Sequence, residues 1–544
     1  MNLMYLAQSG LSSAQAGLSV IGNNLNNALT PGYSRQMLLL GEAGGKTTNI
    51  GFFGYGVQVD GIERAYDGFV NNEVRGATTE LYSLNGHYQQ VSQIDNMFGD
   101  TTNNVSIAFG GIFESMQKMG SDPSSMASRQ ETYAQFNSLS YKFQTNSKTL
   151  NGLEKSTNTQ INQSVNDINN CAQQLANINA QIEKIHSQTG NSPSDLLDQR
   201  DRLLDTMSAQ IGIKVTENPK TGRVDVTLAN GLSLVNGDKA YALETRASAA
   251  NPNIEEVYYI DASGNAMQLD ESKFTSGKLG GLFTFRNEDL VKSRNELDQL
   301  ALQMANEFNT VNAKGYDANG QQGGDIYNIP NPTPIANRNN TSDAMLDVTY
   351  TNISDVNAID YTIVFKGPDW EITTSDGRLI TPEIGDDGEL LFDGISVKPN
   401  GVPESGDSFL LNPVSGAAAG ISVAITDGSQ IAASSSPDID DENNNENLHE
   451  LLAIKDKKMI GNATFAEAYA SMVSSVGNTT SSLKGDLTTS SKVLDQWLYE
   501  KQAISGVDMN EEFVNLTMFT QYYQANAQVL QTAISIFDTI LSIR

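Results

Sequence analysis

The chain has one cysteine, Cys171, and three histidines, His87, His186 and His449, among 544 residues. A single cysteine excludes an internal disulfide. The histidines lie far apart in the sequence and share no metal-ligand spacing with the cysteine, which argues against a zinc site or a nucleophilic centre. We therefore expect no catalytic residue, no metal site, no cofactor and no enzymatic activity, and we interpret Cys171 as a buried core residue.

Positive charge is also scarce. The chain has 34 Lys and Arg against 64 Asp and Glu, which gives a formal net charge of -30. Because binding to phosphates requires clustered basic residues, this balance argues against nucleic acid and the membrane surface as partners. Charged residues of both signs make up only 18% of the chain, below the roughly 25% of a typical soluble protein. Asn, Gln, Ser and Thr take their place.

Long apolar runs are missing as well. No stretch approaches the roughly 18 uninterrupted apolar residues of a membrane-spanning helix, and no Lys or Arg precedes an apolar run at the N-terminus as it does in a cleavable secretory signal. We expect a soluble chain without a cleavable signal peptide. Its 544 residues exceed the roughly 250–300 at which single cores stop growing, so several domains are expected.

The first 34 residues contain no charged side chain, yet apolar residues recur at steps of three and four. This heptad stripe consists of Met4, Ala7, Leu11, Ala14, Leu18, Ile21 and Leu25. Glycines within the segment each weaken an isolated helix by up to about 1 kcal/mol relative to alanine, so the helix needs a partner. Pro31, in a Thr-Pro-Gly sequence, is expected to end the helix near Ala28.

The C-terminal segment repeats this pattern. After Glu512 only Asp538 and Arg544 carry charge, and apolar residues again step by three and four. We assign to this second stripe Phe513, Leu516, Tyr523, Ala527, Leu530, Ile534, Phe537 and Leu541. The two predicted helices span about 40 Å and somewhat more than 50 Å. Because these lengths are commensurate, residues 1–34 and 507–544 are predicted to pair as coiled-coil helices on one axis.

An apolar helical stripe is most often an ordinary core-facing surface. Here both stripes lie at the chain ends, and their outer faces carry Asn, Gln, Ser and Thr instead of Lys and Glu. Such helices have little to keep them monomeric, whereas stacked copies bury those faces through side-chain hydrogen bonds. We predict an assembly interface in which each stripe hides its apolar edge against the other and its polar back against adjoining copies.

Between the two ends the pattern alternates between helix and sheet. Helical periodicity dominates residues 35–210, 284–330 and 447–506, which we assign to an elongated helical bundle. Two-residue alternation with Asn-Gly and Asp-Gly turns predicts β-rich insertions at 211–283 and 331–430. Residues 431–446 are acidic and aperiodic, and we interpret them as a linker. The predicted fold class is α+β and multidomain.

One predicted bundle helix, residues 195–204, carries opposite charges close together along one face. We interpret this face as the solvated side of the bundle.

Two terminal segments resemble a known family. The residues that carry the N-terminal signature of flagellar rod, hook and hook-associated proteins are Asn23, Asn24, Leu25, Thr30, Pro31, Gly32 and Tyr33. Near the other end, the residues that extend the resemblance are Tyr523, Gln524, Ala525, Asn526 and Ala527. Residues 195–213 and 306–320 are similar to the hook-associated members. Leu29 stands where the family often has Asn, and 517–521 lacks the usual Tyr-Gln-rich run, but neither departure breaks the heptad.

The resemblance implies a structural component of the bacterial flagellum that forms the junction ring between hook and filament and is needed for filament assembly and motility. The implied partners are further copies of the chain, hook protein, a second junction protein, and the flagellar type III export apparatus with its chaperone. The implied location is extracellular. Two alternatives remain open: another axial protein, such as a hook or filament subunit, and a filament-borne adhesin or enzyme with its activity in a β insertion.

Overall fold

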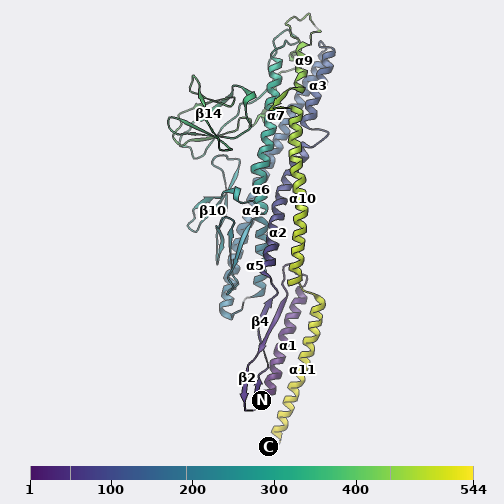
Figure 1. Ribbon diagram of the computed structural model, residues 1–544, viewed down its shortest axis with the longest axis vertical. Coiled ribbons are helices and arrows are strands. Elements are labelled where there is room, and N and C mark those ends of the chain that lie inside the picture. The colour runs from purple at the N-terminus through teal and green to yellow at the C-terminus, as the bar shows by residue number, and fades with distance from the viewer. Residues whose placement is uncertain (1, 50, 192, 442, 543–544) are drawn as a thin grey trace.

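The computed structural model describes residues 2–49, 51–191, 193–441 and 443–542. Figure 1 shows an elongated molecule in which a narrow stalk bearing both chain ends continues into a longer helical bundle, with two β-rich lobes on one side of the bundle. The predicted fold class is confirmed. Residues 1, 543 and 544 of the predicted terminal helices and residue 442 of the predicted linker lie outside the described residues.

The stalk contains the two terminal helices, α1 (Asn2–Asn27) and α11 (Met509–Ser542). They run antiparallel, because Gly17 of α1 faces Phe519 while Gly10 faces Asn526. The Asp508 carboxylate accepts hydrogen bonds from the backbone N–H groups of the first turn of α11 at 2.8 and 3.4 Å. An uncharged sequence with helical periodicity therefore forms a two-helix rod at the end of the molecule (Figure 1).

Residues 36–49 and 51–64, which the sequence pattern assigned to the bundle, instead form two nested β hairpins beside α1. The strands are β1 (Gln36–Glu42), which pairs with β4 (Val57–Arg64), and β2 (Gly45–Thr48), which pairs with β3 (Gly51–Gly54). Gly44 and Gly56 have positive φ angles where the outer ladder passes into the inner one, and Gly51 has a positive φ angle beside the chain reversal between β2 and β3. These hairpins belong to the stalk, so the predicted bundle boundary at residue 35 is wrong.

The bundle consists of long helices with short connections. Its helices are α2 (Gly68–Phe98), α3 (Val105–Ser121), α4 (Met126–Thr189), α5 (Ser194–Gln210), α6 (Gly277–Thr284), α7 (Leu290–Asn312), α9 (Glu446–Ala453) and α10 (Phe465–Ser505). The 64 residues of α4 extend over about 96 Å, so this helix runs along most of the bundle. Thr464 and Glu467 form a capping box at the start of α10, after the short ladder of β23 (Lys458–Ile460) and β24 (Ala463–Thr464).

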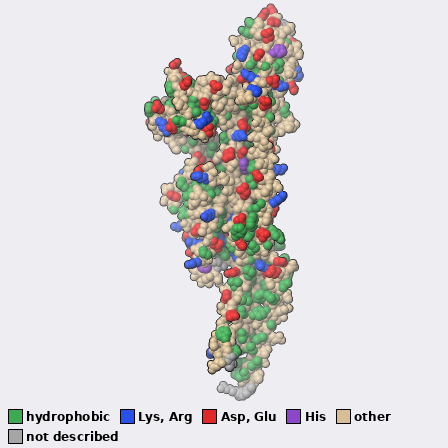
Figure 2. All heavy atoms as spheres, viewed as in Figure 1, with side chains coloured by type: hydrophobic (Ala, Val, Ile, Leu, Met, Phe, Trp, Pro, Cys, Tyr) green, Lys and Arg blue, Asp and Glu red, His purple; other side chains and the backbone are tan. Residues whose placement is uncertain are grey.

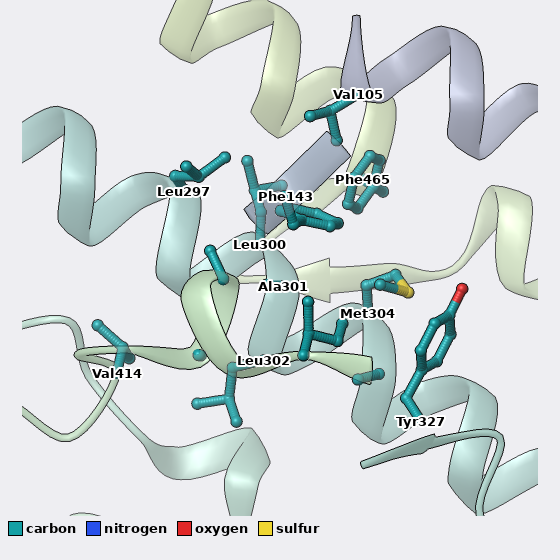
Figure 3. Close-up of a cluster of buried hydrophobic side chains, with 14 of the residues drawn as sticks. Val105, Phe143, Leu297, Leu300, Ala301, Leu302, Met304, Tyr327, Val414 and Phe465 are labelled. Carbon is teal, nitrogen blue, oxygen red and sulfur yellow. The ribbon is translucent and has the colours of Figure 1, made fainter. Parts of the chain in front are cut away.

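An aromatic core holds the bundle helices together. The rings of Phe109 and Phe465 stack with centroids 4.0 Å apart, and those of Phe136 and Phe308 meet edge to face at 5.4 Å. Figure 3 shows how Phe143 and Phe465 lie close together while side chains of α7 such as Leu300 and Met304 line the same core. This core joins helices that lie far apart in the sequence.

The first β-rich lobe contains two antiparallel sheets. The strands, in sheet order, are β5 (Ile213–Glu217), β6 (Val224–Leu228), β7 (Ser233–Asn236) and β8 (Lys239–Ala240), then β11 (Ala266–Gln268), β10 (Glu255–Ile260) and β9 (Leu243–Ala247). The predicted insertion 211–283 runs too far, because the chain is already helical from Gly277. Glycine disfavours helices, but Gly281 is needed here: a Cβ on it would lie 2.1 Å from the carbonyl oxygen of Ser83.

The second β-rich lobe also contains two antiparallel sheets. The strands of the first are, in order, β13 (Ile335–Ala336), β21 (Ser408–Leu411), β15 (Tyr361–Phe365), β16 (Trp370–Thr374) and β17 (Leu379–Ile380). Those of the second are β14 (Met345–Tyr350), β20 (Ile395–Asn400), β19 (Leu390–Phe392) and β18 (Glu383–Ile384). A short ladder of β12 (Tyr327–Asn328) and β22 (Ser422–Val423), with the one-turn helix α8 (Ala417–Gly420), connects the lobe to the bundle.

Candidate assembly interface

The two stalk helices touch through small residues. Ala7, Gly10, Ala14 and Gly17 are buried along α1. A Cβ on Gly10 would lie 2.2 Å from the side-chain oxygen of Asn526, and a Cβ on Gly17 would lie 2.3 Å from the ring of Phe519. The glycines that weaken an isolated helix therefore permit the close approach of the two helices. This role was missed from the sequence, where they had been interpreted only as destabilising.

The predicted stripe residues fall into three groups. The buried ones are Ala7, Ala14 and Ile21. The half-buried ones are Leu11, Leu18, Leu25, Leu516, Ala527 and Leu530. The exposed ones are Met4, Phe513, Tyr523, Ile534, Phe537 and Leu541. Within the described residues of α11 only Glu512 and Ala533 are buried. The C-terminal stripe is therefore only partly covered within one chain, because α1 offers it a narrow face of small residues.

Large apolar side chains consequently remain exposed along the stalk. On α11, Val514 is 68% exposed and Ile540 61%. On the hairpins the exposed apolar residues are Met37, Leu39, Leu40, Phe52, Phe53, Tyr55, Val59 and Ile62. Figure 2 shows the stalk as green and tan atoms with few charged side chains, whereas acidic and basic groups are spread over the bundle and lobes. Monomeric proteins rarely leave such apolar surfaces uncovered, so this one is a candidate contact surface.

Asn24 of the N-terminal signature organises the exit from α1. Its side chain is buried, donates from Nδ2 to the Gln36 carbonyl oxygen at 2.9 Å, and accepts at Oδ1 from the Gln36 N–H at 2.9 Å. The same Oδ1 accepts from the Tyr33 hydroxyl at 2.8 Å. Burial, together with the negative charges of Asp198 and Glu512, raises the pKa of Tyr33 to about 12, so the hydroxyl keeps its proton. Asn24 thus anchors the first residue of β1 to α1.

The turn between Asn24 and Gln36 explains other signature residues. Gly32 has a φ of 74° and the Tyr33 N–H donates to the Thr30 carbonyl oxygen at 3.2 Å, which describes a turn with Pro31 and Gly32 at its centre. Thr30, Pro31 and Gly32 are exposed. This half of the signature is therefore required by backbone geometry.

The remaining signature residues are mostly exposed. Asn23 is exposed and donates from Nδ2 to the side-chain oxygen of Gln36 at 3.2 Å. At the C-terminal end, Tyr523, Gln524 and Ala525 are exposed, whereas Asn526 and Ala527 are half-buried. Backbone geometry within one chain does not account for the exposed residues, so they are candidates for contact with other chains.

A buried ionic network joins the stalk to the bundle. Arg64 at the end of β4 lies 2.9 Å from Asp198 and 2.6 Å from Asp201, both on α5, and Arg75 of α2 lies 3.1 Å from Asp201. Arg200 is fully buried beside Asp201 at 3.1 Å. The interpretation of this charged face as solvated was wrong. Its arginine partners come from segments more than 100 positions away, which helix spacing cannot reveal.

Further contacts on the stalk side complete the joint. The Arg35 N–H donates to the carbonyl oxygen of Ser505 at 2.8 Å, and its guanidinium lies 2.8 Å from the Glu511 carboxylate. Lys501, near the end of α10, lies 3.1 Å from Asp205 of α5. Strand, bundle helix and terminal helix are therefore tied together where the chain enters and leaves the stalk.

Replacing Asn24 by Ala is expected to lower the stability of the stalk by about 2 kcal/mol, because two buried backbone groups of Gln36 and the Tyr33 hydroxyl lose their partner. Hydrogen exchange of the β1 and β4 amides measures this. Asn26→Ala, at an exposed position of the same helix, is the matched control and should leave exchange unchanged. Equal protection in the two variants would contradict the anchoring role of Asn24.

The described part of the chain contains no group of three or more His, Cys, Asp or Glu side chains placed to hold a metal ion. Across the same residues, no helix combines the length and apolarity that crossing a membrane demands.

Known families match most of the chain in separate segments. Residues 91–327 match the helical domain of flagellar hook-associated protein FlgK, and residues 335–413 match the D2-like domain of flagellar hook-associated protein 1. The stalk matches families of the flagellar basal body rod, with residues 4–33 in one and residues 502–543 in the FlgEFG C-terminal family. The stalk helices therefore match families of the flagellar basal body rod, whereas the middle of the chain matches families of the hook-associated proteins.

Flagellar hook-associated protein 1 of Salmonella typhimurium is 40% identical to this chain over 552 residues, and the match covers 100% of both chains. The chain belongs to the flagellar hook-associated protein 1 family. Flagellar hook-associated protein 1 of Escherichia coli is 38% identical over 548 residues, again covering 100% of both chains. A solved structure of the hook junction protein FlgK from Burkholderia pseudomallei has the same fold, with a TM-score of 0.72 and 23% identity over 80% of this chain and 100% of that one.

Membership in the hook-associated protein 1 family makes this a flagellar structural protein, as the resemblance implied. The full-length matches carry the name of hook-associated protein 1 and do not support a hook or filament subunit as the alternative.

Proposed function

We propose that this chain is a structural subunit of the junction between hook and filament, where it is required for filament growth and motility and catalyses no reaction. One observation carries the proposal: a stalk with few charged side chains leaves large apolar side chains exposed on both α11 and the hairpins. A monomer gains nothing from such a surface, whereas a closed assembly of identical subunits buries it.

The arrangement of the chain suits that role. The stalk would stack along the flagellar axis, while the bundle and the two lobes would lie farther out. The ionic network around Asp201 would hold the angle between stalk and bundle, because several charge pairs fix it at once. Those predicted stripe residues that are exposed in one chain are proposed to meet adjoining subunits.

The proposed partners are further copies of this chain in a ring, hook protein on one side and a second junction protein on the other. The chain is proposed to leave the cell unfolded through the flagellar type III export apparatus, delivered by a chaperone and without a cleavable signal peptide. A single cysteine removes one obstacle to that route.

A strain that lacks this chain tests the proposal. We expect hooks without filaments and monomeric flagellin released into the medium, because filament subunits find no surface on which to assemble. Electron microscopy of the cells and analysis of the culture medium measure both effects, and complementation with the intact chain should restore filaments. Normal filaments in the deletion strain would refute the proposed function.

Deleting residues 1–30 is expected to abolish incorporation into flagella while leaving the bundle folded, since the aromatic core lies outside the deleted segment. Immunodetection in purified flagella measures incorporation, and circular dichroism of the isolated protein measures the fold. Limited proteolysis of the intact monomer should trim it near Arg35 and near Lys501. If the stalk ends resist proteolysis as strongly as the bundle does, they need no partner chain to stay folded.

A further inference from the structure

Glu512, in the first turn of α11, is a buried residue whose carboxylate has one oxygen without a hydrogen-bond partner among the described residues. The residue is 3% exposed, and the oxygen concerned is Oε2. Beside it lies a cavity of about 190 Å³ between α1, β1 and α11, lined among others by Asn24, Gln36 and Asn515. Charged groups are rarely buried unless they are paired. The cavity therefore has the chemistry of a site for a cationic group.

The cation of the same chain that lines the cavity is engaged only in part, because the Nε atom of Arg35 is also buried without a hydrogen-bond partner among the described residues. Arg35 lines the cavity, but its guanidinium pairs with the more exposed Glu511 at 2.8 Å. Its backbone N–H is bound to Ser505 and its carbonyl oxygen accepts from Ala65, which fixes the residue in the joint. Arg35 thus narrows the cavity without pairing with Glu512.

Among the described residues of the stalk, Lys46 on β2 is an exposed cation of suitable length. Lys46 is exposed and makes no ion pair with the described residues. It lies opposite Phe53 in the β2–β3 hairpin, and Phe52 and Phe53 are 64% and 44% exposed. This hairpin therefore presents an ammonium group beside the uncovered Phe53 ring, while Phe52, the preceding strand residue, lies on the opposite face.

The surface around Glu512 is complementary to that hairpin. Met509 and Phe513, one on each side of it in the sequence, are 47% and 51% exposed. Within one chain the two surfaces cannot meet. The base of the hairpin lies at Ser9, which Gly56 contacts, whereas the cavity extends along α1 from Gly17 to Asn24, about 12 to 22 Å farther along that helix.

We propose that the β2–β3 hairpin of one copy docks against the start of α11 of a second copy, so that the Lys46 ammonium group enters the cavity and pairs with Glu512. This inference rests on the proposed function and specifies the contact between its subunits. Each copy uses two different surfaces, so the contact is heterologous and builds rings or helices instead of closed dimers. It also requires neighbouring copies to be displaced along the stalk axis.

Zero-length cross-linking tests the contact directly. A carbodiimide activates a carboxylate and couples it to an adjacent amine, so treating purified flagella should join Lys46 to Glu512 of another copy. We expect covalent multimers of this chain and a cross-linked peptide that contains both residues, identified by mass spectrometry. Lys46→Gln and Glu512→Gln should each abolish that peptide, whereas Glu511→Gln, at the neighbouring exposed carboxylate, should leave it in place.

The outcomes separate this inference from the function on which it rests. The docking contact alone would be overturned if filaments are present and other lysine–carboxylate cross-links form, but no Lys46–Glu512 peptide is found. A Lys46–Glu512 peptide found only in monomeric protein would also overturn it, because the contact would then lie within one chain. Failure of the proposed function would show separately, as normal filaments in the deletion strain.

A double-mutant comparison gives a second readout that needs no chemical coupling. Lys46→Gln changes an exposed side chain and should leave the isolated monomer unaltered, yet we expect it to reduce the fraction of hooks that carry filaments. Glu512→Gln should have a similar effect, and the double variant should be no worse than either single one, because the two residues act as one pair. Additive losses would contradict direct pairing.

Discussion

Asp201→Asn is expected to destabilise the bundle end of the joint by about 3 kcal/mol, because it removes the negative charge that Arg64, Arg75 and Arg200 share in a buried setting. Asp201 is 6% exposed and Arg200 is fully buried, so water cannot replace the lost pairing. Urea unfolding followed by the fluorescence of Trp497 measures the change. The chain has a second tryptophan, Trp370. The measurement is therefore made in a chain that carries Trp370→Phe, so that the tryptophan fluorescence comes from Trp497.

The matched control is Glu131→Gln, which breaks an ion pair with Lys118 whose side chains are 43% and 63% exposed. Exposed pairs contribute only about 0–1 kcal/mol, so this variant should unfold close to the unaltered chain. Equal effects of the two substitutions would show that the joint does not depend on buried charge pairing.

Asp201 also gives the joint a defined dependence on pH. Burial alone raises the pKa of this carboxyl group, but the charges of Arg200, Arg64 and Arg75 outweigh burial and hold it below the ordinary value of 3.8. Because the folded-state pKa is the lower one, the stabilisation is fully present above pH 3.8 and is lost as pH falls through the folded-state value. Asp201→Asn should remove this part of the acid dependence.

Gly17→Val is expected to separate the stalk helices and prevent incorporation into flagella. Even a Cβ at this position would lie 2.3 Å from the Phe519 ring, and forcing extra volume into a close contact costs about 1–3 kcal/mol. The contact with α1 is narrow, so a loss of this size should free α11. Hydrogen exchange of the α11 amides measures pairing in the monomer, and immunodetection in purified flagella measures incorporation.

Gly22→Val provides the control on the same helix. A Cβ on Gly22 has no neighbour within 4 Å, so the substitution changes helix propensity to the same degree without a clash. This variant should retain α11 protection and should be incorporated. If Gly22→Val disrupts the stalk as strongly as Gly17→Val, the flexibility of glycine matters there and the close approach of the helices does not.

Several misjudged features share one cause. The charged face of α5 was interpreted as solvated, yet Arg64 and Arg75 reach it from β4 and α2 and exclude water from Asp201. Most of α6 was assigned to the predicted β-rich insertion 211–283, although Gly281 packs this helix directly against Ser83 of α2. Residue identity and spacing describe one segment at a time, whereas burial depends on what other segments bring to it.

The spacing of apolar residues alone determined that both ends of the chain are helices, that two β-rich regions interrupt a bundle, and that the terminal helices carry apolar stripes. These are local properties, since helical and strand periods appear within a few turns of the chain. The tertiary structure decided which stripe residues stay exposed, that hairpins accompany α1, and that the Glu512 Oε2 atom is buried with no hydrogen-bond partner in the described part of the chain. Each of these depends on the close approach of segments far apart in the sequence. The spacing of residues within one segment does not reveal which other segments pack against it.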